Sequence, residues 1–138
     1  MKKIITLLFI ALVSTSITFA QNNSTKKADK LFDRLEYVKA AEEYLKLTDK
    51  NPDNYIIGRL ADSYYNMFNT VEAEKWYSKI IDDDPNAEVI FRYSEMLKAN
   101  GKYKESNVWM SKFSEMKPYD TRAIAFRNTP NYIDKIIK

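Results

Sequence analysis

The sequence predicts an all-α protein, a right-handed α-α superhelix of three helical hairpins closed by a C-terminal capping helix. Pro52, Pro85 and Pro118 stand 33 residues apart, and a period of this size is typical of solenoids of stacked units. Two glycines in 138 residues argue against a β-rich fold with many tight turns. The same step of 33 relates small residues to one another and bulky apolar residues to one another: Ala28, Ala61 and Ser94; Ala40, Ala73 and Ser106; Tyr44, Tyr77 and Met110; Leu47, Ile80 and Phe113.

The first 20 residues have the layout of a secretory signal peptide. Lys2 and Lys3 form a basic start, residues 4–13 are apolar except for Thr6, and a stretch of small residues ends at Ala20, where cleavage is expected. Polar residues interrupt the apolar run too early for a membrane-spanning helix, which needs about 20 apolar residues. We therefore expect an exported protein, periplasmic or associated with the outer membrane, with no direct membrane insertion after cleavage.

The composition excludes several classes of function. Removing Lys2 and Lys3 leaves 20 basic residues against 19 acidic ones, so there is no charge excess that would suggest a nucleic-acid partner. The chain has no cysteine and no histidine, which excludes disulfides and thiolate metal sites and removes most nucleophilic and general-base arrangements. We expect no cofactor, no metal site and no catalytic residue.

The pattern along the chain predicts its organisation. Residues 21–26 form a flexible leader, three repeats follow at 27–53, 54–86 and 87–118, and 119–138 holds capping helices or the start of a further domain. The expected helices are 27–35, 37–50, 54–68, 71–82, 86–100 and one that stops before Pro118, with a last short helix after residue 131. Helix caps are expected at Asp53, Asn69 with Thr70, Asn86 and Asp120, and Gly101 is expected in the left-handed conformation that ends a helix.

These units resemble tetratricopeptide repeats (TPRs), helix–turn–helix units of about 34 residues. In that family the first helix carries a small residue and a tyrosine, the second carries an alanine and then an aromatic, and a proline closes the unit. The matching residues are Ala28, Ala40, Tyr44 and Pro52; Ala61, Tyr64, Ala73, Tyr77 and Pro85; and Gly101 with Pro118. The third unit departs from the pattern at Ser106 and Met110. The resemblance implies a TPR-like solenoid that binds a protein or peptide partner and is not an enzyme.

A narrower resemblance concerns the cell envelope. The signal peptide, the segment Lys27–Phe32 and the three repeats are similar to the N-terminal TPR region of OmpA-like outer-membrane-associated proteins of Gram-negative bacteria. No OmpA-like domain is present, so peptidoglycan binding is not implied. Two functions follow as expectations: a protein-interaction scaffold exported to the envelope, or a structural module that positions a larger outer-membrane assembly.

The resemblance also implies a partner groove, because the first helices of TPR units line the concave face. The candidate groove residues are Asp29, Phe32, Asp33, Arg59, Asp62, Tyr65, Asn66, Arg92, Glu95 and Lys98. They combine an acidic row, an arginine pair and an aromatic wall, which suits a peptide groove. The alternative is a solvated face with internal Arg–Asp pairs, and the sequence leaves both open. Chaperone-binding members of the family grip a C-terminal carboxylate with lysines and asparagines, whereas these positions are mainly acidic here.

Two further features have competing interpretations. The run Asp82–Asp84 lacks the glycine and the alternating ligands of a calcium loop, so a solvated loop is expected. Trp76 and Trp109 occupy equivalent places on second helices, where packing between hairpins is expected. The alternative for the tryptophans is an exposed hot spot on the convex face.

Overall fold

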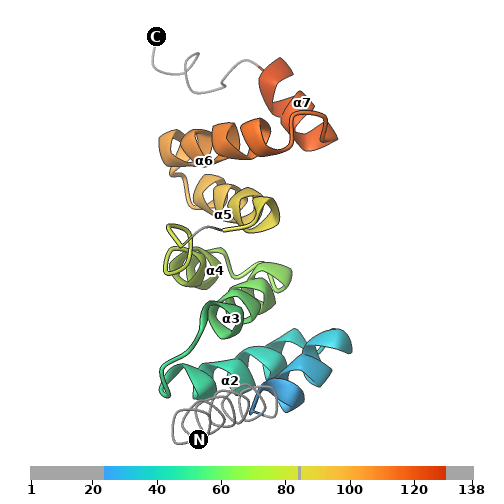
Figure 1. Ribbon diagram of the computed structural model, residues 1–138, viewed down its shortest axis with the longest axis vertical. Coiled ribbons are helices and arrows are strands. Elements are labelled where there is room, and N and C mark those ends of the chain that lie inside the picture. Colours follow the sequence, from blue (N-terminus) through green and yellow to red (C-terminus); the bar gives the residue numbers. More distant parts are fainter. Residues whose placement is uncertain (1–23, 84, 130–138) are drawn as a thin grey trace, which may run out of the picture.

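The structure, a computed structural model, describes residues 24–83 and 85–129, and every regular element in this part is a helix. After the helix 24–33 come α2 (Tyr37–Thr48), α3 (Asn54–Asn66), α4 (Thr70–Tyr77), α5 (Ala87–Ala99), α6 (Tyr103–Met116) and α7 (Thr121–Asn128). The helices stack as hairpins into an elongated, twisted column (Figure 1). Each helix packs mainly against the helices before and after it in the sequence. The all-α stack is thus confirmed, whereas the predicted signal peptide and the last short helix lie outside the described residues.

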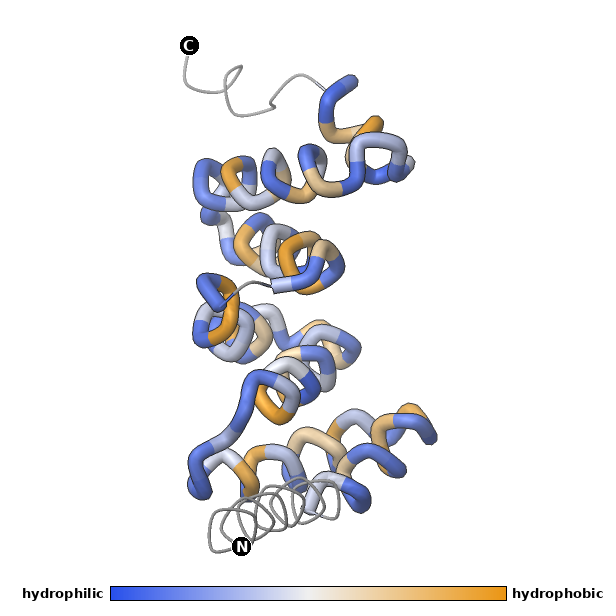
Figure 2. Tube along the Cα trace, viewed as in Figure 1, coloured by the Kyte–Doolittle hydropathy of each residue, from blue (hydrophilic) through white to orange (hydrophobic). Residues whose placement is uncertain are grey.

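The periodic small residues lie where helices approach one another. Ala28, Ala40, Ala61 and Ala73 are at most 1% exposed. A methyl side chain lets two backbones come close, and the larger side chains alongside them fill the remaining space. The largest fully buried side chains are Tyr44, Tyr77, Phe113, Leu60 and Leu97. Hydrophobic and hydrophilic residues alternate along each helix (Figure 2), so every helix buries one face in the column.

The two tryptophans pack as the sequence predicted. Trp76 is 8% exposed and belongs to the hydrophobic core. Trp109 is partly buried and packs edge to face against Tyr93, with 5.6 Å between the ring centroids. Neither ring offers the exposed convex hot spot of the alternative interpretation.

The predicted helix caps are present. Side-chain oxygens of Asp53, Asn86 and Asp120 accept hydrogen bonds from backbone N–H groups in the first turns of α3, α5 and α7, at 2.9, 3.0 and 2.9 Å. Asn69 caps α4 in the same way at 3.3 Å. Since the first N–H groups of a helix have no partner within it, these caps fix where the helices begin.

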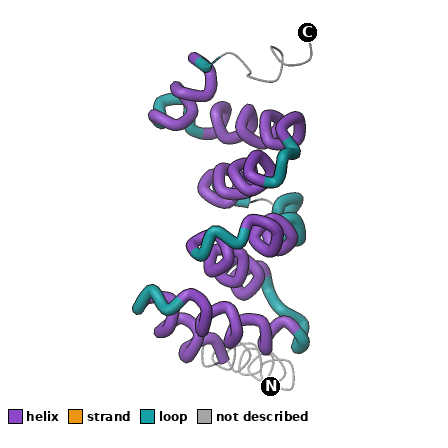
Figure 3. The backbone as a smooth tube through the Cα atoms, turned by 180° about the vertical axis from the view of Figure 1, so that it is seen from behind, coloured by secondary structure: helices purple, strands orange, loops and turns teal. Residues whose placement is uncertain are grey.

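Some predicted helix ends were wrong, most clearly in the second unit. We expected its second helix to run to Asp82, but α4 ends at Tyr77. Beyond it the hydrogen bonds Lys79 N–Trp76 O, Ile80 N–Tyr77 O and Asp83 N–Ile80 O form successive three-residue turns. The Ser78 hydroxyl donates to the Lys75 carbonyl, a local bond that competes with the helical pattern. The chain therefore makes a broad loop between α4 and α5 (Figure 3).

The turn inside each hairpin has one recurring geometry. Leu35, Phe68 and Gly101 have φ values of 61°, 55° and 80°, and they are one period apart. The N–H of the following residue bonds back to the carbonyl five positions earlier, as in Glu36 N–Leu31 O at 2.9 Å. Only Gly101 was foreseen, because a left-handed backbone disfavours leucine and phenylalanine. The first two units therefore hold strained residues whose apolar side chains are 69% and 72% exposed.

We predict that Phe68→Gly raises the free energy of unfolding by about 0.5–1 kcal/mol, since relief of the left-handed strain exceeds the entropy that glycine adds to the unfolded chain. Gly101→Ala should lower it by about 1 kcal/mol, although a Cβ there meets nothing within 4 Å, because only the backbone is strained. Urea denaturation measures both. Destabilisation by Phe68→Gly would show that the ring makes a contact stronger than the strain.

Candidate peptide-binding groove

The residues proposed for the groove come from three helices, 24–33, α3 and α5. Of these residues, the exposed ones are Asp33, Asn66, Glu95 and Lys98, and the rest are partly buried. The structure brings the predicted charged and aromatic groups together, but in pairs that cross from one unit to the next.

Asp62 links three helices of two units. Its Oδ1 accepts a hydrogen bond from the Tyr77 hydroxyl on α4 at 2.6 Å and one from Nη1 of Arg92 on α5 at 2.7 Å. The Arg92 guanidinium also lies 5.3 Å from the ring centroid of Tyr65. Tyr65 in turn donates to Oε2 of Glu95 at 2.8 Å. The second and third units are thus joined by a carboxylate, two hydroxyls and a stacked cation.

The first and second units repeat this arrangement. Asp29 accepts hydrogen bonds from Tyr44 at 2.5 Å and from Tyr55 at 2.8 Å. The Arg59 guanidinium lies over the Phe32 ring, 4.0 Å from its centroid, and Nη2 reaches Asp33 at 3.5 Å. Nε of Arg59 is buried and 4.0 Å from Asp29, too far for a hydrogen bond, and has no hydrogen-bond partner in the described chain.

These contacts alter the acidity of the groups involved. Partial burial acts to raise the pKa of Asp29, but hydrogen bonds from Tyr44 and Tyr55 outweigh it and lower the pKa below its ordinary value. Burial, together with the hydrogen bond to Glu95, raises the pKa of Tyr65 to about 12. Burial and the charge of Asp62 likewise raise the pKa of Tyr77. The carboxylates are therefore ionised and the phenols are protonated at neutral pH.

Both arginines are occupied within the molecule. The internal Arg–Asp pairs that the sequence left as an alternative are present, and the side chains left open to solvent are Asp33, Asn66, Glu95 and Lys98. Within the described residues no ion pair forms at Glu95 or Lys98. That a partner binds this face stays a prediction, and such a partner would meet mainly carboxylates and amides.

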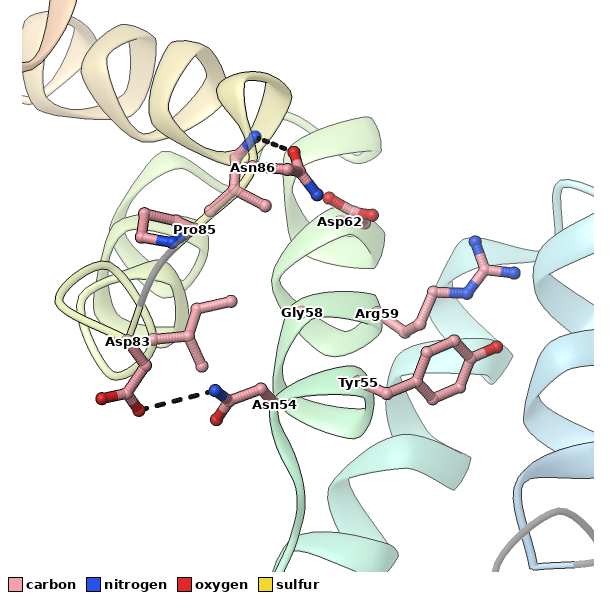
Figure 4. A pocket seen from close by; sticks show the side chains of 10 residues that line it. Asn54, Tyr55, Gly58, Arg59, Asp62, Asp83, Pro85 and Asn86 are labelled. Atoms are coloured by element: carbon pink, nitrogen blue, oxygen red, sulfur yellow. Dashed lines mark hydrogen bonds between the residues drawn. The ribbon is translucent and has the colours of Figure 1, made fainter. Parts of the chain in front are cut away.

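The structure adds a cleft that the sequence analysis missed. A hollow of about 320 Å³ lies between α3, the loop after α4 and the start of α5 (Figure 4). Its lining includes Asn54, Gly58, Ile80, Asp83, Asn86 and Val89, none of which was a candidate. The available signal was Gly58, a glycine inside a helix at a position where the other units carry Thr25 and Phe91.

Other kinds of site find no support in the part of the chain that the structure describes. No group of three or more histidine, cysteine, aspartate or glutamate residues between 24 and 129, residue 84 aside, could hold a metal ion. Asp82 and Asp83 are exposed, in line with the expected solvated loop. No described helix is both long and apolar enough to cross a bilayer.

The Asp29 contacts predict a dependence of stability on pH. Because the folded pKa lies below the unfolded one, Asp29 contributes stability above the unfolded pKa that is lost as pH falls through the folded value. Asp29→Asn should lower the free energy of unfolding by about 1–2 kcal/mol at pH 7 and flatten its fall toward pH 3. Urea midpoints at both pH values test this. Asp33→Asn, whose side chain is 71% exposed, is the matched control and should change stability by less than about 0.5 kcal/mol. Equal acid sensitivity of Asp29→Asn and the unmodified chain would contradict the assignment.

Comparison with protein-family models and with curated proteins finds no match. Solved structures are similar. The second TPR domain of human RPAP3, in complex with the HSP70 peptide SGPTIEEVD, matches over 83% of this chain and 92% of its own, with a TM-score of 0.63 and 19% identity. The first TPR of Spaghetti (RPAP3), bound to the HSP90 peptide SRMEEVD, gives 83%, 90%, 0.65 and 19%. The first TPR domain of human RPAP3 gives 74%, 82%, 0.60 and 19%. The described part of this chain therefore has the TPR fold.

Proposed function

We propose that this chain is a non-enzymatic scaffold that binds a peptide segment of another protein. The observation that carries the proposal is the face made by 24–33, α3 and α5, which joins partly exposed aromatic rings, exposed polar side chains and an open cleft. Stacked hairpins present such an extended surface to partners. Two of the similar TPR structures hold short peptides, which supports the same use here.

The chemistry of the face argues against the acid-tailed peptides of those two structures. Both of these peptides end in Glu-Glu-Val-Asp, whereas the cations Arg59 and Arg92 of this chain are already paired with its own carboxylates. An acidic peptide would meet Asp33 and Glu95 with no free arginine to bind it, and like charges at a contact disfavour association. The preferred ligand is therefore neutral or basic.

Selection from a random 12-residue peptide library against residues 21–138 tests the binding function. We expect binders whose affinity falls about tenfold or more in the triple variant Asp33→Ala, Asn66→Ala, Glu95→Ala, because exposed polar contacts on the face are lost. The matched control is Glu42→Ala, Lys75→Ala, Val108→Ala, three exposed positions one period apart on the second helices. Failure to select any binder, or equal weakening by both triples, would reject the proposal.

We infer further that the scaffold works in the bacterial envelope, on the strength of the signal-peptide pattern in residues 1–20. Expression of the tagged chain in a Gram-negative host should give a periplasmic product whose N-terminus is Gln21. Ala20→Tyr should leave it uncleaved, because the processing site requires a small residue. N-terminal sequencing and fractionation measure both. A full-length cytoplasmic product would contradict export, and a product held in the outer-membrane fraction would favour the structural role in a larger assembly.

A further inference from the structure

The cleft beside Gly58 exists because the second unit departs from its neighbours at equivalent positions. On the first helices the series is Thr25, Gly58 and Phe91; on the second helices and their ends it is Leu47, Ile80 and Phe113; at the start of the next unit it is Ile56, Val89 and Arg122. In the first unit Thr25 and Ile56 are each only 5% exposed. The space between consecutive first helices is thus closed there by the chain's own side chains.

In the third unit the equivalent space is filled by an arginine. The Phe91 and Phe113 rings lie 5.2 Å apart, and the Arg122 guanidinium sits over both, 4.3 and 4.9 Å from their centroids. Arg122 Nη1 donates to Glu88 at 2.9 Å, and Nη2 donates to Asp120 at 2.9 Å. The site accommodates a stacked cation held by carboxylates.

In the second unit the same space is empty in the folded chain. Gly58 and Ile80 replace the two phenylalanines, and Val89 stands where Arg122 does, too short to fill the hollow of about 320 Å³. Packing does not require the glycine, because a Cβ at Gly58 would meet Ile80 Cδ1 at 3.5 Å, an ordinary contact. A glycine inside a helix costs about 1 kcal/mol relative to alanine. The second unit therefore carries a destabilising residue that keeps a cleft open.

The charges around the cleft suit a cation. Asp83 receives only a long hydrogen bond of 3.5 Å from Asn54, across one end of the cleft (Figure 4). Asp62 uses Oδ1 for both Tyr77 and Arg92, and its Oδ2 receives no hydrogen bond from the described residues. Arg59 also lines the cleft, but its side chain points away from Gly58 toward the first unit, where it stacks on Phe32.

We propose that the Gly58 cleft binds an arginine side chain of the partner peptide, the intermolecular counterpart of Arg122 in the third unit. The aliphatic part of the arginine packs on Gly58, Ile80 and Val89, and the guanidinium meets Asp83 and the free oxygen of Asp62. The inference rests on the proposed function, since the cleft lies in the candidate groove, and it assigns the groove a basic ligand.

The test uses N-acetyl-arginine methylamide as the probe and the uncharged isostere N-acetyl-citrulline methylamide as its control. In NMR titrations of the isotope-labelled residues 21–138, we expect millimolar concentrations of the arginine probe to shift the amides of Gly58, Asn86 and Val89. The citrulline probe should bind about threefold or more weakly, as should the arginine probe to Asp83→Asn, because a partly exposed ion pair contributes up to about this factor.

Variants of the cleft separate this site from general attraction of cations. Gly58→Phe and Val89→Arg fill the cleft with the residue types found one period later and should abolish the localised shifts, whereas Gly58→Ala should retain them. Circular dichroism confirms folding of each variant, and the two blocking variants act independently. Equal binding of citrulline, or shifts that persist in both blocking variants, would overturn the arginine site. The small probe reports on the cleft even if the library yields no peptide, so failure of this inference and failure of the proposed function are distinguishable.

Discussion

The stack depends on a carboxylate that serves two neighbours at once. In a solenoid each unit contacts only the units beside it, so the contacts between units carry the stability that a globular core would provide. Asp62 on α3 binds Tyr77 within its own hairpin and Arg92 in the next one, through the same oxygen. A partly buried carboxylate needs such partners, and removing one leaves a charge without compensation. This single group therefore fixes the angle inside a hairpin and the angle between hairpins together.

The same coupling limits what the face can bind. Arg59 and Arg92 are the cations that an acidic ligand would need, and both are used to join units. The coupling stops in the third unit, where Met110 replaces the tyrosine and Ser106 donates instead to the Ser94 carbonyl at 2.7 Å. There Arg122 takes over the contact to the following helix. Structure and ligand preference are thus set by one arrangement of charges.

The period of 33 residues was sufficient to predict the fold, the buried alanines and tyrosines, and the helix caps. It could not predict the left-handed Leu35 and Phe68, because local preference favours glycine or asparagine there and tertiary packing overrode it. The groove residues were proposed from their places on first helices, but which aspartate each arginine contacts depends on the twist between units. The cleft was missed since a cavity follows from several side chains that are short at the same time, here Gly58 and Val89.

A repeat protein contains its own controls, and this makes departures from the repeat informative. The first and third units show what packing alone requires between consecutive first helices: a closed space, filled by Ile56 in one case and by Arg122 in the other. The second unit keeps the same backbone arrangement but leaves the space open at the expense of a helical glycine. Since neither backbone conformation nor steric crowding calls for Gly58, the open cleft is best explained by something that enters it. The arginine seen one period later indicates the chemistry of that group.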